Sequence, residues 1–102
     1  MIPVNDFMID ALAELLRPAP LTPEKVAFAW RHAVGPAVAR ATNVALNGSE
    51  LIVRVDSGEW HREIKRSAGV IRDRVERLLG RGTVRSLKVV PPAENTRLYS
   101  GV

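Results

Sequence analysis

The feature that most constrains the fold of this sequence is a predicted β-hairpin that turns at Asn47 and Gly48. Apolar residues alternate with other residues on both sides of this pair, at Val44, Leu46, Leu51, Val53 and Val55. An Asn-Gly pair between two alternating runs is the strongest short-range hairpin signal, because a type I′ turn needs positive φ at both central positions. The sequence therefore predicts two antiparallel strands joined by a type I′ turn at Asn47 and Gly48.

A first helix is predicted near the start of the chain. Either Asn5 or Asp6 can cap its beginning. The helix should end at about Leu16, because Pro18 and Pro20 follow it. Apolar residues at i, i+4, i+7 and i+8 form its predicted buried stripe, which comprises Met8, Leu12, Leu15 and Leu16.

A second helix should begin directly after the prolines. Thr22 can cap it, and Pro23 suits the first helical position. Its predicted inner face comprises Val26, Ala29, Trp30, Ala33 and Ala37. Gly35 and Pro36 should break this helix, because a proline inside a helix loses a hydrogen bond and clashes with the preceding turn. Residues 37–41 then form a further helical turn.

A long helix and a third strand are predicted after the hairpin. Ser57 can cap the helix, and Gly80 and Gly82 should end it. One apolar stripe with a period near 3.6 runs along it, comprising Trp60, Ile64, Ala68, Ile71, Val75, Leu78 and Leu79. Residues 83–90 should form the third strand, with Leu87 and Val89 pointing inward and two prolines stopping it.

The expected order of elements is helix, helix, strand, strand, helix, strand. A strand, helix and strand in succession place the third strand parallel to the second. The predicted fold is therefore α+β, with one three-stranded mixed sheet and helices packed on one face. Its open face should carry Ile52, Arg54, Ser86 and Lys88. At 102 residues the chain has room for one core, so we expect a single domain over residues 1–92 and a short flexible tail over residues 93–102.

Positive charge is concentrated in the second half of the chain. Residues 54–88 hold ten Lys and Arg against five Asp and Glu, a balance of +5. Residues 1–53 hold four basic and five acidic residues, a balance of minus one. This asymmetry indicates a polyanion or an acidic protein surface as the partner of the second half. The alternative is an ordinary solvated helix face of mixed charge.

Candidate binding residues follow from this asymmetry. The predicted DNA-contacting side chains are Arg54, Arg62, Lys65, Arg66, Arg81, Arg85 and Lys88. Two further arginines, Arg72 and Arg77, lie on the same polar side of the predicted long helix. Trp30 is in phase with its apolar neighbours and should be a core anchor, whereas Trp60 and His61 begin the basic helix and are the predicted partner-binding residues. DNA contacts should go mainly to phosphates, with little readout of bases.

Several function classes are excluded by absent residue patterns. Cysteine is absent, which excludes disulfides, thiolate metal sites and cysteine nucleophiles. The two histidines, His32 and His61, lie in separate predicted helices without a paired carboxylate or a phosphate-binding loop. We therefore expect no enzyme, no cofactor, no metal and no small-molecule substrate. The sequence also has no long apolar run and no basic signal-peptide start, so a cytoplasmic protein without a membrane partner is expected.

A combination of residues across the hairpin resembles the signature of the DciA family. It comprises Trp30, then Val34, Gly35 and Pro36, then Ala39, Asn43, Leu46, Asn47, Gly48, Leu51, Ile52, Val53, Val55, Ser57, Trp60, Glu63 and Ile64. The resemblance extends more loosely over residues 7–90. It implies a KH-like domain in a bacterial protein that associates with the DnaB-type replicative helicase, promotes its loading and binds DNA.

The sequence departs from KH chemistry in one respect. KH domains hold the nucleic-acid backbone with a Gly-x-x-Gly loop, and this spacing does not occur in the chain. Binding through the standard KH groove is therefore not expected. The prediction is a non-enzymatic DNA-replication accessory domain that associates with the replicative helicase and binds DNA weakly without sequence preference. The alternative is a single-stranded DNA or RNA binding module without a helicase role.

Overall fold

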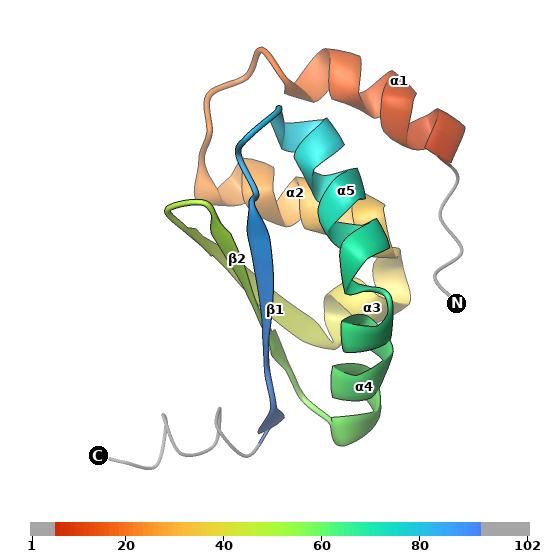
Figure 1. Cartoon of the computed structure of the whole chain (residues 1–102). Helices are drawn as coiled ribbons and strands as arrows, with labels where there is room; N and C mark the ends of the chain where they lie inside the picture. The colour runs from red at the N-terminus through yellow and green to blue at the C-terminus, as the bar shows by residue number, and fades with distance from the viewer. Residues whose placement is uncertain (1–5, 93–102) are drawn as a thin grey trace.

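Helices cover one face of a three-stranded sheet in the computed structural model, which describes residues 6–92 (Figure 1). Its elements are α1 (Asp6–Leu16), α2 (Pro23–Val34), α3 (Pro36–Arg40), β1 (Thr42–Asn47), β2 (Glu50–Val55), α4 (Gly58–Arg66), α5 (Ala68–Leu79) and β3 (Ser86–Val90). The strand order is β1-β2-β3, with β1 antiparallel and β3 parallel to β2. The predicted α+β class and order of elements are confirmed, while the KH-like assignment stays a prediction.

The central strand separates a packed face of the sheet from an open one. Leu51, Val53 and Val55 on β2 are fully buried among the helices. Leu87 and Val89 on β3 pack against the same core, as predicted. The strand register places the alternate residues on the opposite face, which we call the open sheet face: Asn43, Ala45 and Asn47 on β1, Glu50, Ile52 and Arg54 on β2, and Ser86, Lys88 and Val90 on β3. The predicted open-face residues are among them.

The hairpin turn lies one residue later than predicted. Asn47 pairs with Glu50, so the two turn residues are Gly48 and Ser49. Gly48 has a φ of 63°, whereas no residue other than glycine has positive φ within residues 6–92. The type I′ turn at Asn47 and Gly48 is therefore wrong. A glycine with positive φ at the first central position fits a type II′ turn, and Asn47 stays in the strand.

Gly48 should be sensitive to a side chain and Gly69 should not. We expect Gly48→Ala to lower the free energy of unfolding by about 1 kcal/mol, because alanine is strained at positive φ. The matched control is Gly69→Ala in α5, where a Cβ meets open space. This change should raise stability by about 0.5–1 kcal/mol, since alanine favours a helix. Urea denaturation of both variants tests the pair, and equal effects of the same sign would contradict this turn.

The predicted long helix is divided in two at Ser67. The Ser67 N–H donates to the carbonyl oxygens of both Glu63 and Ile64 at 3.2 Å, which closes α4. The Ser67 carbonyl then accepts from the Ile71 N–H at 3.0 Å, in the first turn of α5. A single continuous helix was therefore the wrong prediction. Its apolar stripe nevertheless holds, because Ile64, Ile71 and Val75 are all fully buried. Ser57 caps α4 as predicted, accepting from the Trp60 N–H at 3.2 Å.

The buried side of α1 differs from the predicted stripe. Ile9 and Ala13 are buried, whereas Met8 is 52% and Leu15 is 75% exposed. Two overlapping apolar stripes run along this helix, and contact with α5 selects between them. With Ile9 and Ala13 packed inward, Asp10 lies beside α5 and forms an ion pair with Arg77. Leu12 and Leu16 remain partly buried against the core, as predicted.

Trp30 is the core anchor that its phase predicts, with only 2% of its surface exposed. Its Nε1–H donates to Thr42 Oγ1 at 2.8 Å, and the Thr42 hydroxyl donates to the Val38 carbonyl at the same distance. These bonds join α2, α3 and β1 around the tryptophan. Thr22 caps α2 as predicted. Ala37 is exposed, contrary to prediction, because Gly35 turns the chain with a φ of 92° and α3 presents Val38 to the core instead.

The third strand is shorter than predicted. It begins at Ser86, so residues 83–85 belong to the preceding loop, in which Val84 is fully buried. The tail predicted over residues 93–102 and the possible cap at Asn5 lie outside the described residues. Within residues 6–92 no helix is both long enough and apolar enough to cross a membrane.

Candidate nucleic-acid and partner interface

Three predicted contact residues lie together on α4. Arg62, Lys65 and Arg66 are exposed, while Ile64 on the same helix is fully buried. The helix therefore directs its positive charge outward because its apolar side faces the core. An ion pair joins Arg66 to Glu63 at 3.6 Å. Such an exposed pair contributes little stability and leaves the guanidinium accessible.

A second basic group lies where α5 leads into β3. Arg81 and Arg85 are exposed in this loop, and Lys88 is exposed on β3. The Arg85 N–H donates to the Ser49 carbonyl at 2.7 Å, which joins the loop to the hairpin turn. The backbone around these side chains is therefore held in place by the fold, although the side chains themselves point to solvent.

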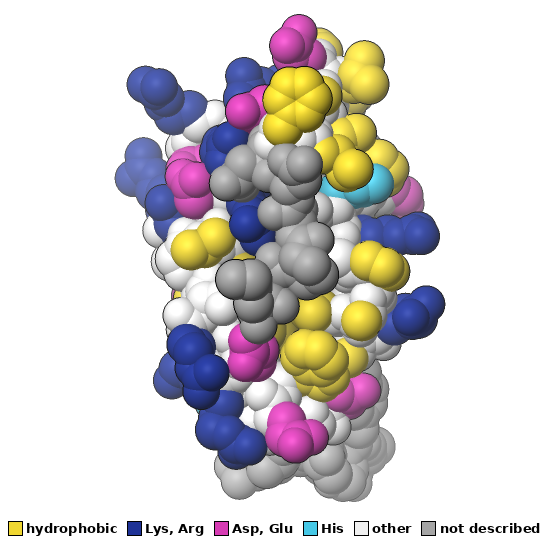
Figure 2. Space-filling view, turned by 90° about the vertical axis from the view of Figure 1, so that its right-hand side faces the viewer, with side chains coloured by type: hydrophobic (Ala, Val, Ile, Leu, Met, Phe, Trp, Pro, Cys, Tyr) yellow, Lys and Arg dark blue, Asp and Glu magenta, His cyan; other side chains and the backbone are white. Residues whose placement is uncertain are grey.

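The two elements that carry most of these residues, α4 and the loop between α5 and β3, lie at opposite ends of α5 (Figure 1), while Lys88 lies along β3. A helix of 12 residues is about 18 Å long, which matches roughly five base pairs of DNA. Figure 2 shows Lys and Arg side chains gathered in an upper and a lower group along the left-hand side of that view. This arrangement suits contacts to phosphates spaced along one nucleic-acid strand.

Arg54 lies apart from both groups. It is half-buried on the open sheet face, where β2 is the central strand. Its register neighbours are Asn43 on β1 and Val90 on β3. Lys88 lies on the same face, beside Ile52, which is two residues before Arg54 on β2. The structure therefore does not bring all seven predicted DNA-contacting residues onto one surface, because Arg54 and Lys88 lie on the open sheet face, away from the helices.

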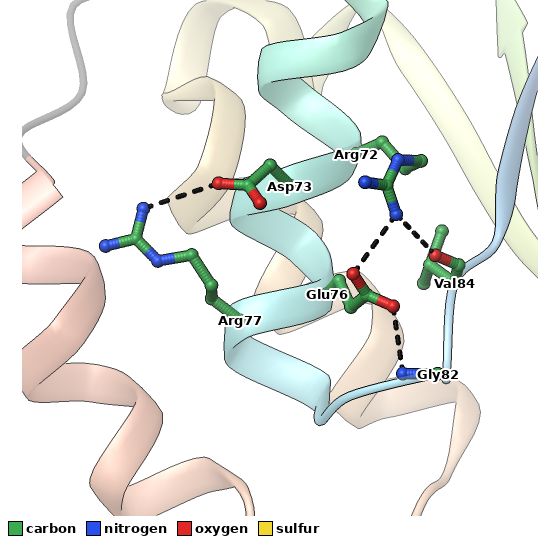
Figure 3. A network of polar contacts seen from close by, with 6 residues as sticks. All are labelled: Arg72, Asp73, Glu76, Arg77, Gly82 and Val84. Carbon is green, nitrogen blue, oxygen red and sulfur yellow. Dashed lines mark hydrogen bonds and ion pairs between the residues drawn. The ribbon is translucent and has the colours of Figure 1, made fainter.

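A polar network holds the loop that carries Arg81 (Figure 3). Glu76 in α5 accepts from the Gly82 N–H at 2.9 Å and from an Arg72 guanidinium nitrogen at 3.1 Å. The same Arg72 nitrogen donates to the Val84 carbonyl at 2.9 Å. The Gly82 N–H and then Arg72 lower the pKa of Glu76, because both favour its charged form. Arg72 therefore supports the loop, which gives it a structural role.

Stability should depend on the charge of Glu76 at acid pH. Because its pKa is lowered in the folded state, the carboxylate contributes stability above its ordinary pKa of 4.5. That contribution is lost as pH falls through the lower folded pKa. We therefore expect Glu76→Gln to lower the melting temperature at neutral pH and to flatten its decline between about pH 5 and pH 3. Glu14→Gln on exposed α1 is the control. A decline of unchanged steepness in Glu76→Gln would contradict this role.

Arg77 also has a structural role. Its guanidinium is paired with Asp73 at 3.6 Å and with Asp10 of α1. Arg17 Nε–H at the end of α1 donates to the Arg77 carbonyl at 2.9 Å. These contacts attach α1 to α5. Lys25 in α2 holds the loop that follows α1: it is buried, and its Nζ donates to the carbonyls of Ala19 at 2.7 Å and Arg17 at 3.4 Å. No pattern in the sequence indicated this role for Lys25.

The predicted partner-binding residues begin the basic helix. Trp60 is half-buried and packs against the core, and His61 beside it is also half-buried. Both are therefore partly accessible, directly before Arg62. The sequence analysis did not single out two further accessible aromatic residues, Phe7, which is 80% exposed, and Phe28, which is 41% exposed and whose ring lies 4.3 Å from that of His32. The exposure of Phe28 could have been predicted from the sequence, because its position is out of phase with the buried side of α2. Figure 2 shows hydrophobic side chains gathered in its upper part, over α1 and α2.

Within the described residues no group of three or more His, Asp or Glu side chains is placed to hold a metal ion.

The comparison with known proteins assigns the chain to a protein family. A search of curated proteins finds no match. A family model described as "Dna[CI] antecedent, DciA" matches residues 7–89, well over half of the 102 residues. The matched region includes every helix and strand from α2 to α5 and all but the last residue of β3. The chain therefore belongs to the DciA family.

Proposed function

We propose that this chain is a non-enzymatic bacterial DNA-replication accessory domain that associates with the DnaB-type replicative helicase and assists its loading. Membership of the DciA family implies a helicase-loading role of this kind, and this membership is the observation that carries the proposal. The family match includes α4 with Trp60. We take residues 1–92 as the functional domain, acting in the cytoplasm where the replicative helicase works.

The proposal includes weak DNA binding through phosphates. The support is two basic groups: Arg62, Lys65 and Arg66 lie on α4 at one end of α5, and Arg81 and Arg85 lie in the loop at its other end, with Lys88 on β3. Lysine and arginine bind phosphates without reading sequence. Arg54 is a separate candidate on the open sheet face. This distribution favours contact along a backbone over recognition of single bases.

The helicase contact is assigned to Trp60 and His61. A partly exposed tryptophan at the start of a helix supplies apolar area and a hydrogen-bond donor, a combination that is enriched among residues dominating interface energies. His61 adds a second ring beside it. Arg62 extends the same surface toward the basic group, so one helix would contact both helicase and DNA.

Replacing Trp60 should weaken helicase association strongly. We expect Trp60→Ala to raise the Kd for the organism's own DnaB-type helicase by about 30-fold, which corresponds to about 2 kcal/mol at an interface hot spot. Phe28→Ala is the matched control, because it removes another partly exposed aromatic ring from α2. Biolayer interferometry with purified helicase measures both Kd values, after circular dichroism has shown that both variants fold. A Kd unchanged by Trp60→Ala would remove Trp60 from the interface.

The second candidate function is a single-stranded DNA or RNA binding module without a helicase role. The observation that favours it is the basic side of α4, α5 and β3. This surface can bind a polyanion such as a nucleic acid without any contact to a helicase. A salt titration of nucleic-acid binding, run beside the helicase association assay, separates the two. Nucleic-acid binding without helicase association at the same protein concentrations would favour the second function.

A further inference from the structure

The sheet has one edge that lacks the usual protection against pairing. β1 pairs only with β2 among residues 6–92, so its outer side is an exposed edge. Its six residues include no charged residue and no proline. The other edge, β3, carries Lys88 and is followed directly by Pro91. Natural edge strands are commonly blocked by lysine or proline because open backbone groups invite another strand. The β1 edge has neither.

An apolar hollow of about 300 Å³ lies along this edge. We call the β1 edge together with this hollow the edge groove. One wall is formed by the start of α2 and the loop before it, and the other by β1 and its turn. All lining residues are uncharged: Leu21, Thr22, Pro23, Val26, Val44, Ala45, Leu46 and Gly48.

The position of the lining residues shows that the hollow reaches the backbone of β1. Val44 and Leu46 point to the helical side of the sheet, whereas Ala45 between them points to the open sheet face. A hollow in contact with all three must extend to the strand itself. Val44 and Leu46 are only partly buried, and Leu21 on the opposite wall is 54% exposed. Apolar surface is therefore available directly beside the open backbone groups.

The chemistry of the edge groove specifies its occupant. Every second residue of an edge strand directs its N–H and C=O outward, and only another extended backbone can pair with such a row. The uncharged lining offers nothing to a phosphate or to a charged side chain. We propose that the edge groove binds an extended, uncharged peptide segment of another protein, which adds as a strand to β1. Apolar side chains at alternate positions of this segment enter the hollow.

The size of the edge groove argues for a linear segment over a second copy of the chain. Six strand residues extend about 20 Å, so a strip about 10 Å wide buries on the order of 200 Å² per partner. Stable interfaces between folded proteins need about 800 Å² per partner. The edge groove is therefore too small to hold a second folded copy in a stable dimer, whereas a short extended segment that binds weakly needs no more than the length of β1. The edge groove lies on β1, which is not adjacent to β3, and the inference does not rest on the helicase role.

The test begins with a library of random linear octapeptides displayed on phage and selected against the full chain. Multivalent display compensates for weak single-site affinity. We expect enrichment of peptides that are uncharged over at least five positions, with Val, Ile, Leu or Phe at alternate positions. Three forms of the most enriched peptide are then synthesised: one unmodified, one with N-methyl groups on the odd-numbered residues and one with N-methyl groups on the even-numbered residues. N-methylation removes backbone donors and leaves the side chains unchanged.

Binding of the synthetic peptides is followed by NMR on the ¹⁵N-labelled chain. The unmodified peptide should shift the amide signals of β1 and of residues 21–26. N-methylation at one of the two sets of alternate peptide positions should abolish binding. Leu21→Asp should weaken binding at least tenfold, because it places a charge in the apolar wall. Leu15→Asp is the matched control on α1 and should change the Kd less than twofold; it is exposed and does not line the groove. Dispersed spectra of both variants establish that they fold.

Four outcomes would overturn the proposal. They are the absence of any enriched peptide, enrichment of charged or helix-patterned peptides, binding of both N-methylated forms as tight as that of the unmodified peptide, and binding that survives Leu21→Asp. Light scattering provides a further test, since a dimer of the free chain that Leu21→Asp dissociates would show that a second copy occupies the groove.

Discussion

Trp30→Ala is expected to lower the free energy of unfolding by about 3–5 kcal/mol, the largest effect of a single substitution in this chain. The indole is buried, and its Nε1–H donates to Thr42 Oγ1 at 2.8 Å. The substitution removes this bond and leaves a cavity between α2, α3 and β1. Because a domain of this size has about 5–15 kcal/mol of stability in total, the variant should be close to unfolding at 37 °C.

Two comparisons separate the contributions at this position. Trp30→Phe retains most of the apolar volume but loses the hydrogen bond, so it should cost less than Trp30→Ala, about 1–2 kcal/mol. Phe28→Ala, two positions earlier on the exposed side of α2, should cost less than about 1 kcal/mol. Guanidinium denaturation measures all three. A Trp30→Ala variant within 1 kcal/mol of the wild type would contradict its role as the anchor of the core.

The second large effect concerns DNA binding and salt. If four phosphates are bound, raising salt from about 50 mM to about 200 mM should weaken duplex binding about 100-fold, because each neutralised phosphate releases condensed counterions. The variant Arg81→Gln, Arg85→Gln, Lys88→Gln removes three exposed charges from the α5–β3 loop and from β3. It should make the slope of log K against log salt less steep by about 0.9 for each phosphate that the variant no longer binds. Fluorescence anisotropy with labelled DNA measures the slope.

The control for this experiment removes positive charge elsewhere. Arg31→Gln, Arg40→Gln neutralises two exposed arginines on α2 and α3, outside the two basic groups. It lowers the net charge and should leave the slope nearly unchanged. Equal changes of slope in the two variants would mean that overall charge, and not the surface of α4, α5 and β3, governs binding.

The hairpin shows what local sequence predicts and what it leaves open. The Asn-Gly pair located the hairpin correctly because such a pair seldom occurs between alternating apolar runs without one. The position of the turn within it does not follow from the alternation. A pairing of Leu46 with Ser49 and a pairing of Asn47 with Glu50 both place Leu51, Val53 and Val55 on the same face as Val44 and Leu46, and the structure has the second, with Gly48 and Ser49 in the turn.

The helices show the same limit. Ile64 and Ile71 are two helical turns apart, so the apolar period is unaffected by the break at Ser67 and gives no sign of it. In α1 two apolar stripes overlap, and the choice between them depends on packing against α5, which lies more than 50 residues away in the sequence. Sequence periodicity finds elements reliably but cannot choose between alternatives that tertiary contacts decide.

The candidate site was predictable in part. The positive half of the chain identified the exposed residues of α4 and the α5–β3 loop. It placed Arg72 and Arg77 on the same polar side, but their contacts to Val84 and Asp10 could not be predicted, because these residues are brought close only by folding. The edge groove was also missed, since its two walls lie about 20 residues apart in the sequence.

The central claim is that this chain acts with the replicative helicase. The most direct measurement is loading of the organism's own DnaB-type helicase onto single-stranded DNA coated with single-strand-binding protein, read out as unwinding of a labelled fork. With the chain present, unwinding should increase, and Trp60→Ala should abolish the increase while Phe28→Ala should retain it. No association and no stimulation, at concentrations where the chain binds DNA, would contradict the claim.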